Sequence, residues 1–172
     1  NCNLKRIEIE EYDIMLGTFK QLGLALSICN NSRFRYFYLG GCIFEDEDAA
    51  EFIRSLEGVH TFTDLELRGN TIVNMERGQL CCAIGYLLTN AMSNIVVLTI
   101  SDTSSLDDMC LILLRNALMR NKTVVYLNLS GNVAISSNGW CAFSRVLSCP
   151  TCVIKTLVLR DTQMDSEVIA CL

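Results

Sequence analysis

Six segments of the sequence repeat one pattern, and this repetition constrains the fold more than any other feature. Each segment alternates apolar and variable residues over its first six positions, as expected for a short strand with one buried face. The fourth residues of successive segments are 30, 28, 33, 29 and 30 positions apart. The segments are LKRIEIEEYDI from Leu4, FRYFYLGGCIF from Phe34, FTDLELRGNTI from Phe62, IVVLTISDTSS from Ile95, VVYLNLSGNVA from Val124 and IKTLVLRDTQM from Ile154.

A helical pattern follows the strands. In the third unit, for example, Leu80, Ile84, Leu87 and Leu88 are spaced so that they form one apolar stripe on a helix. Strand, helix and strand at this period place the strands in parallel, side by side, with each helix packed behind its own strand. We therefore expect an α/β fold: a curved solenoid with a parallel β-sheet on its concave face and α-helices on its convex face.

The pattern LxxLxLxxN, seen in FTDLELRGN and VVYLNLSGN, resembles the leucine-rich repeat. A full helix in each unit of this period is similar to the ribonuclease-inhibitor-like class of that family. The resemblance extends over nearly the whole chain. It implies a single leucine-rich-repeat domain, residues 1–172, of about six repeats that start near residues 4, 34, 62, 95, 124 and 154.

The ninth position of the repeat is usually Asn, Cys or Thr in this family. A buried asparagine there can satisfy backbone groups of the turn, and threonine or cysteine can do so less fully. Only the tyrosine of the first unit departs from this pattern, which leaves the geometry of its loop open. The ninth residues are Tyr12, Cys42, Asn70, Thr103, Asn132 and Thr162.

The sequence CPTC, residues 149–152, could carry thiol chemistry, hold zinc or connect two repeats. In thioredoxin-like sites the CxxC motif begins a helix that follows a strand, whereas here it follows a helix and precedes a strand. A zinc site would need further ligands, and the only histidine, His60, lies three repeats away. We predict that CPTC is the joint between the fifth and sixth repeats, with Pro150 ending the helix.

The other candidates for chemistry are weak. A histidine-based triad would need His60, which we interpret as a loop residue. The acidic run of residues 45–48 lacks the alternating ligands and central glycine of an EF-hand, and we interpret it as the start of a helix. No phosphate loop of the type GxxxxGK[ST] occurs in the sequence. We therefore predict no enzymatic activity, no metal and no cofactor.

The composition limits which classes of partner the chain can bind and whether it can enter a membrane. Hydrophobic residues make up 51% and charged residues 19%, which is the balance of a globular domain. The net charge is −5 and the 14 Lys and Arg are scattered, so we expect no nucleic-acid partner. No apolar run reaches the roughly 18 residues of a membrane span, so we expect no membrane insertion.

Most of the 10 cysteines lie among Leu, Ile and Ala, where Cys behaves as a small hydrophobe, so we predict a reducing, cytoplasmic location. Glycosylation sequons at Asn30, Asn121 and Asn128 favour the opposite location. Because the first residue is Asn1 and neither end resembles a polar capping repeat, we expect the chain to be a piece of a longer polypeptide.

The third, fifth and seventh residues of each repeat should project from the concave face. Tyr36 and Tyr38 stand there between rows that carry Glu8 and Glu66. Exposed tyrosines beside charges are typical of interface centres, and the alternative is a solvated sheet with incidental tyrosines. The predicted partner-binding residues are Tyr36, Tyr38, Asp64, Glu66, Arg68, Tyr126 and Asn128.

A second surface is predicted on the convex side. With Leu114 facing the core, Ile112 and Met119 lie near the opposite side of the fourth helix, and Tyr86 points outward from the third. A helix that is apolar all round is usually buried on both sides, so a further domain or a partner would cover this patch. The alternative is scattered apolar surface residues, which are common.

These observations predict a non-enzymatic protein–protein interaction module, a scaffold or recognition surface, whose partner is another protein or a subunit of a larger assembly. One alternative is a GTPase-activating protein similar to the Ran GTPase activator, with Arg68 or Arg160 as its candidate arginine. Another is the ligand-sensing region of a NOD-like receptor, which would need a nucleotide-binding domain elsewhere.

Overall fold

The computed structural model describes residues 3–11, 18–28, 33–74 and 78–171 of the chain. Six strands form one parallel sheet in the order β1-β2-β4-β6-β7-β8, so neighbours in the sheet follow each other along the chain. This confirms the α/β class and the parallel sheet. The strands are β1 (Arg6–Glu10), β2 (Tyr36–Gly40), β4 (Asp64–Arg68), β6 (Val97–Ser101), β7 (Tyr126–Asn128) and β8 (Thr156–Val158).

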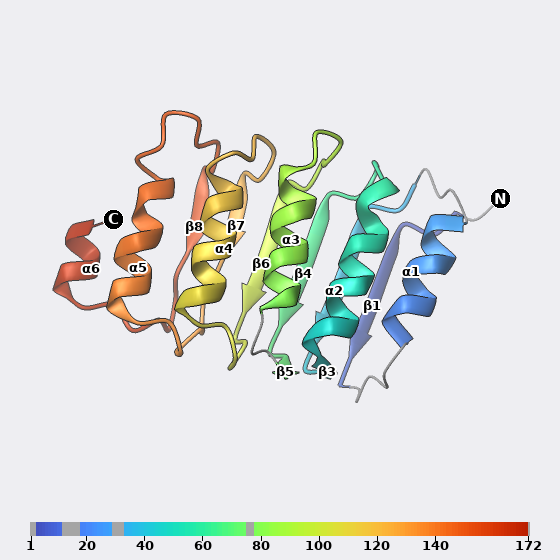
Figure 1. The fold of residues 1–172 in the computed structure, drawn as a ribbon, viewed down its shortest axis with the longest axis horizontal. Coiled ribbons are helices and arrows are strands. Elements are labelled where there is room, and N and C mark those ends of the chain that lie inside the picture. Colours follow the sequence, from blue (N-terminus) through green and yellow to red (C-terminus); the bar gives the residue numbers. More distant parts are fainter. Residues whose placement is uncertain (1–2, 12–17, 29–32, 75–77, 172) are drawn as a thin grey trace.

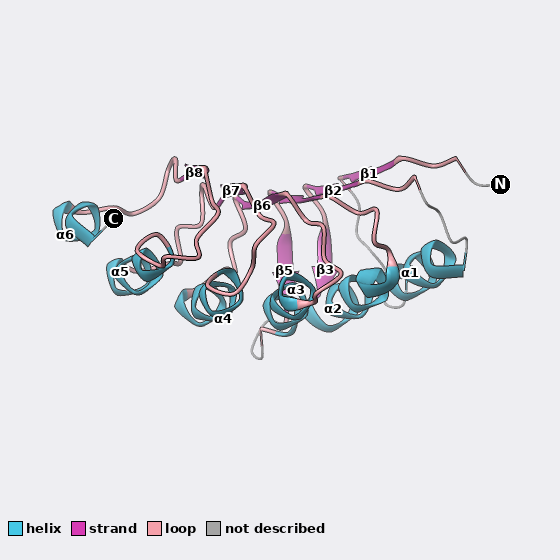
Figure 2. Cartoon of the chain, turned by 90° about the horizontal axis from the view of Figure 1, so that it is seen from above, coloured by secondary structure: helices cyan, strands magenta, loops and turns pink. Residues whose placement is uncertain are grey.

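The helices form a single layer behind this sheet. Figure 1 shows them side by side in chain order, and Figure 2 shows that they all lie on the same side of the strands. Short strands β3 (Ile43–Glu45) and β5 (Thr71–Val73) form a separate parallel pair. The helices are α1 (Thr18–Ile28), α2 (Asp46–Ser55), α3 (Gln79–Thr89), α4 (Asp108–Leu118), α5 (Ser137–Phe143) and α6 (Ser166–Cys171), with 3-10 turns η1 (Leu56–Gly58) and η3 (Ser144–Val146).

The strands pair in the alignment that the sequence pattern gives. The fourth residue of each segment pairs with the fourth residue of the next, as Phe37 does with Leu65 and Leu65 with Leu98. These side chains are buried on the helix side in the four inner strands. The third and fifth residues therefore lie on the opposite face, because successive side chains of a strand point to opposite sides.

A residue in the left-handed conformation follows each strand, at the eighth position of every segment. Glycine occupies three of these positions, and Glu or Asp occupies the others. The N–H groups of five of them donate to the carbonyl of the seventh residue in the next segment, with N···O distances of 2.8 or 2.9 Å. This turn therefore extends the hydrogen-bonded stack beyond the strands. The six residues are Glu11, Gly41, Gly69, Asp102, Gly131 and Asp161.

Buried asparagines at the ninth position satisfy the turn that follows. The Asn132 amide donates to the carbonyls of Ile100 at 2.7 Å and Leu129 at 2.9 Å, and its oxygen accepts the Thr103 N–H at 3.1 Å. Asn70 bonds the backbone of the preceding unit in the same way, at Leu39. The predicted role of the ninth position is confirmed for these residues; Tyr12 lies outside the described residues.

Carboxylates tie the start of one helix to the start of the next. Asp46, the first residue of α2, is buried and accepts the N–H groups of Gln79 and Leu80 at 2.7 and 2.8 Å, at the start of α3. Asp108, the first residue of α4, accepts the N–H and hydroxyl of Ser136, which caps α5. Free N–H groups at a helix start favour a carboxylate, so these bonds fix the spacing of neighbouring helices.

A matched pair of glycine substitutions tests the left-handed turns. Alanine at either Gly69 or Gly131 must adopt a positive φ, which costs about 1–2 kcal/mol. At Gly131 the added Cβ would also lie 2.7 Å from Cγ and 3.1 Å from Cα of Asp102, whereas at Gly69 the nearest atom is 3.8 Å away. We expect Gly131→Ala to reduce the free energy of unfolding clearly more than Gly69→Ala in chemical denaturation. Equal losses would show that the contact with Asp102 is unimportant.

A second substitution tests the buried asparagines. Asn132→Ala leaves two buried carbonyls and one buried N–H without their partners, and each such group costs about 1–3 kcal/mol. We expect the free energy of unfolding to fall by at least about 2 kcal/mol. Asn138→Ala, on the exposed side of α5, is the control and should change it by less than about 0.5 kcal/mol.

Candidate functional site

The face of the sheet opposite the helices, which we call the open face, carries most of the residues predicted to bind a partner. The six labelled helices lie on the other side of the sheet in Figure 2. On the first three strands the open face shows three rows, which are set by the strand register. Arg6, Tyr36 and Asp64 form one row, Glu8, Tyr38 and Glu66 the next, and Glu10, Gly40 and Arg68 the third.

Tyr36 and Tyr38 lie at the centre of these rows and are partly buried. The guanidinium carbon of Arg6 is 4.0 Å from the centroid of the Tyr36 ring. Arg6 also pairs with Glu8, its neighbour on the same side of β1. The Tyr36 ring is therefore held from one side by a cation, an arrangement worth about 0.5–1 kcal/mol at an exposed site.

The opposite side of the tyrosines is charged as well. Arg68 Nη2 lies 3.2 Å from Glu66 Oε2, and both residues belong to β4. The Glu66 carboxylate also lies close enough to the Tyr36 phenol to raise its pKa. Such exposed ion pairs add little stability, so their main effect is to hold charge beside the rings. We call Arg6, Glu8, Tyr36, Tyr38, Glu66 and Arg68 the tyrosine cluster.

Burial and the neighbouring charges raise the pKa of both tyrosine phenols. Partial burial raises the pKa of Tyr36 above its usual range, and the Glu66 carboxylate raises it further. Partial burial likewise raises the pKa of Tyr38, with Glu10 adding to the effect and Arg68 opposing it. Both side chains therefore remain neutral hydrogen-bond donors at physiological pH.

Gly40 gives the Tyr38 ring its place on the sheet. A Cβ atom at position 40 would lie 2.6 Å from Cζ of Tyr38, so the ring covers the glycine two residues along its own strand. The ring thus lies along the surface rather than pointing away from it. Because no side chain competes for this space, Tyr38 presents a flat apolar area beside the charges.

Asp64 lies beside Tyr36 in the first row, whereas Tyr126 and Asn128, also predicted to bind a partner, lie apart from the cluster on β7. Tyr126 belongs to β7, and β4 and β6 separate it from Tyr36, which at the usual strand spacing is about 14 Å. Asn128 is 8% exposed, and its side-chain oxygen accepts the N–H of Ser130, so it stabilises the turn after β7. Between the two groups, Thr99 of β6 is buried, and its hydroxyl has no hydrogen-bond partner in the described part of the chain.

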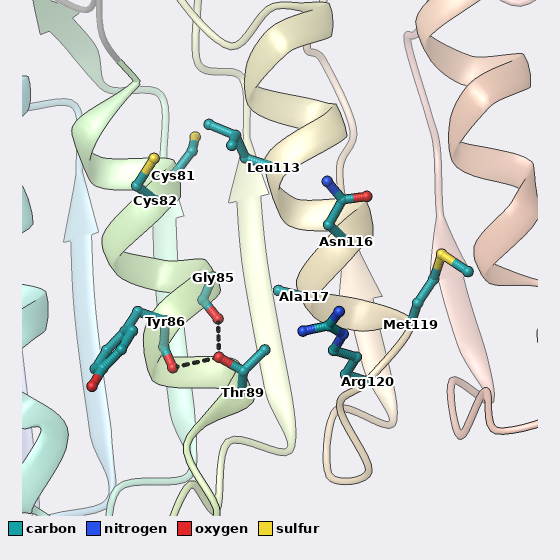
Figure 3. Close-up of a pocket in the computed structure, with 10 residues that line it drawn as sticks. All are labelled: Cys81, Cys82, Gly85, Tyr86, Thr89, Leu113, Asn116, Ala117, Met119 and Arg120. Atoms are coloured by element: carbon teal, nitrogen blue, oxygen red, sulfur yellow. Dashed lines mark hydrogen bonds between the residues drawn. The ribbon is translucent and has the colours of Figure 1, made fainter.

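On the helix side, a groove of about 750 Å³ runs between α3 and α4 (Figure 3). Tyr86 and Met119, two of the three residues predicted for the convex patch, line it. Tyr86 is 61% exposed, whereas Met119 is partly buried against the core. Ile112 is partly buried on α4 and is not one of the lining residues. Tyr86 and Met119 therefore line the same groove, but they lie at its opposite ends in Figure 3.

The CPTC sequence forms the turn between η3 and β8. The N–H of Cys152 donates to the carbonyl of Cys149 at 2.9 Å, and the Cys149 sulfur lies 3.2 Å from the Thr151 hydroxyl oxygen. Hydrogen bonds from Thr151 lower the pKa of the Cys149 thiol. Among the residues described, no group of three or more His, Cys, Asp or Glu side chains is arranged to hold a metal ion.

The sequence-based site omitted Arg6, which contacts the Tyr36 ring directly. Both residues are the third in their segments, so the repeat register already places them side by side. The contact could have been anticipated by comparing equal positions of adjacent units.

No protein-family model matches this chain, and no curated protein sequence matches it. Within the described ranges, no helix is long and apolar enough to cross a membrane.

Alkaline titration tests the electrostatics of the cluster. Glu66→Gln removes both a negative charge and a carboxylate acceptor, so we expect the pKa of the Tyr36 phenol to fall towards its usual value near 10. The titration can be followed by NMR of the tyrosine rings, with Tyr36→Phe used to assign the signal. Glu47→Gln, on the exposed side of α2, is the matched control and should leave this pKa unchanged.

The raised pKa of Tyr36 also makes the stability of the folded chain depend on pH. A phenol with a raised pKa in the folded chain ionises first in the unfolded chain, so stability falls as the pH rises through the pKa of Tyr36. The loss should be smaller in Glu66→Gln. An unchanged Tyr36 pKa in that variant would contradict the contact between the two residues.

Proposed function

We propose that this chain is a protein-interaction module that binds its partner through the open face of the sheet, centred on the tyrosine cluster. The observation that carries the proposal is the pair of partly buried tyrosines on β2, flanked by two ion pairs, on the side of the sheet away from the helices. Tyrosine and arginine are enriched among the residues that dominate binding energy at protein interfaces.

We further propose that the repeating units form a curved leucine-rich-repeat solenoid, with the open face as its concave side. The shared register, the left-handed residue at the eighth position and the buried asparagines at the ninth support this assignment. On this proposal the partner is another protein or a subunit of a larger assembly, the chain forms one cytoplasmic domain, and it carries no catalytic activity.

The open face suits a partner that supplies both apolar and charged groups. Tyr36 and Tyr38 offer ring surface and neutral phenol donors, and their raised pKa moves ionisation further from physiological pH. Glu8, Glu66, Arg6 and Arg68 surround them with both signs of charge, which would orient a partner of complementary pattern. Arg68 is held by Glu66 on this surface, so we assign it to partner binding rather than to activation of a GTPase.

A pull-down with matched tyrosine variants tests the proposal. The baits are the unchanged chain, a variant with Tyr36, Tyr38 and Tyr126 all changed to Ala, and Tyr86→Ala as the same substitution on the helix side. Bound proteins from the native source are identified by mass spectrometry, and affinity for each is then measured with purified partner. We expect the open-face variant to lose a partner by at least about 30-fold in affinity, as for a hot spot of about 2 kcal/mol, with Tyr86→Ala unchanged.

The opposite binding result would place the binding site on the helix side of the molecule. If Tyr86→Ala loses the partner and the open-face variant keeps it, the groove between α3 and α4 is the binding surface and the proposal is wrong. Circular dichroism and thermal unfolding of each variant must match the unchanged chain, because a misfolded bait would lose partners for an unrelated reason.

A further inference from the structure

Two cysteines meet between the last two helices. The sulfur of Cys141 on α5 lies 2.7 Å from the sulfur of Cys171 on α6. A disulfide bond is about 2.05 Å long, so the two sulfurs need to approach by only about 0.7 Å to be bonded. Cys171 is exposed and Cys141 is partly buried, so a soluble oxidant can reach the pair.

The repeat itself brings these residues together. They are 30 positions apart, which is one unit of the sequence pattern, and therefore occupy neighbouring helices. Contacts at the other end of α6 hold the two helices in place. The Ser137 hydroxyl of α5 donates to Asp165 Oδ2 at 2.6 Å, Asp165 Oδ1 accepts the Val168 N–H at 2.9 Å, and the Val168 side chain is fully buried.

We infer that Cys141 and Cys171 form a redox-sensitive thiol pair, which a small disulfide such as oxidised glutathione converts into an intrachain disulfide linking α5 to α6. In the first step the thiolate of one cysteine attacks the glutathione disulfide, forms a mixed disulfide and releases one glutathione thiolate. The second cysteine, as its thiolate, attacks the protein sulfur of this mixed disulfide and releases the other glutathione. Two protein thiols are thereby oxidised and one glutathione disulfide is reduced to two thiols.

Other cysteines of the described chain do not share this arrangement. Cys81 and Cys110 are also close to each other, but both are buried, and the hydrogen bond with Cys110 together with burial raises the pKa of the Cys81 thiol, which keeps it unreactive. Cys149 is more easily ionised, but its sulfur contacts Thr151 and the Met119 carbonyl rather than Cys152. Cys149 is therefore an internal control for general thiol reactivity.

The link would secure one end of the described fold. Helix α6 has six residues, and Ile169 on it is 66% exposed. Its strand, β8, pairs with β7 alone in the sheet. A covalent bond between α5 and α6 would limit how far the sixth unit can separate from the fifth, so oxidation would make this end of the sheet more rigid.

Peptide mapping across a glutathione redox series tests the inference. The folded chain is equilibrated with mixtures of reduced and oxidised glutathione, quenched with acid, alkylated and digested with trypsin. The three relevant cysteine-bearing peptides are separate: residues 123–145 carry Cys141, residues 146–155 carry Cys149 and Cys152, and the peptide that begins at Asp161 carries Cys171. We expect the first and third peptides to be recovered joined by a reducible bond.

Single variants and hydrogen exchange complete the test. Cys141→Ser and Cys171→Ser should each abolish the joined peptide, and oxidation should slow amide exchange over residues 166–171 in the unchanged chain but not in Cys171→Ser. Cys171 is exposed, so its serine variant should fold even if Cys141→Ser does not. Recovery of Cys141 and Cys171 unlinked, as separate glutathione adducts, or joined to other cysteines would overturn the inference.

Discussion

The stacking of one unit on the next depends on backbone hydrogen bonds that continue past the ends of the strands. The strands themselves have only three to five residues, so their ladders alone are short. The left-handed residue after each of the first five strands of the sheet adds a further bond to the neighbouring unit, as Gly69 does to Ser101. Buried asparagines then form hydrogen bonds with the backbone groups that the turn leaves without partners. Without these bonds the buried polar backbone would oppose the packing of the apolar side chains.

This division of positions explains why one face of the sheet is available for binding. The fourth and sixth residues of a unit, such as Leu65 and Leu67, are buried towards the helices, and the ninth residue serves the turn. On β4 the third and fifth residues, Asp64 and Glu66, have no part in either task, whereas on β7 the fifth residue, Asn128, bonds the turn. Their identities can therefore change with little effect on stacking, and they differ strongly between units: tyrosines on β2, carboxylates on β4, and valine with threonine on β6.

The repeat pattern predicts the backbone arrangement better than it predicts side-chain contacts. Strand order and pairing follow from equal positions in successive segments, and the role of Asn70 and Asn132 follows from burial of a polar side chain at a turn. The hydrogen bond from the Ser130 N–H to the Asn128 side chain could not be anticipated from the pattern. The position of Asn128 in its segment indicates an exposed side chain, whereas the local turn offers it the N–H of Ser130. Met119 was expected to be on the surface, but it ends α4 and is packed partly against the core.

The contact between Cys141 and Cys171 is likewise a side-chain contact that the sequence pattern does not reveal. Read along the chain, Cys141 and Cys171 look like isolated small hydrophobes, whereas Cys149 and Cys152 look like a motif. Stacking reverses this order of importance, because side chains one period apart lie closer than those three residues apart in a turn. Proximity in a repeat protein is therefore better judged between equivalent positions of neighbouring units than along the sequence, and this holds for Arg6 and Tyr36 as it does for the two cysteines.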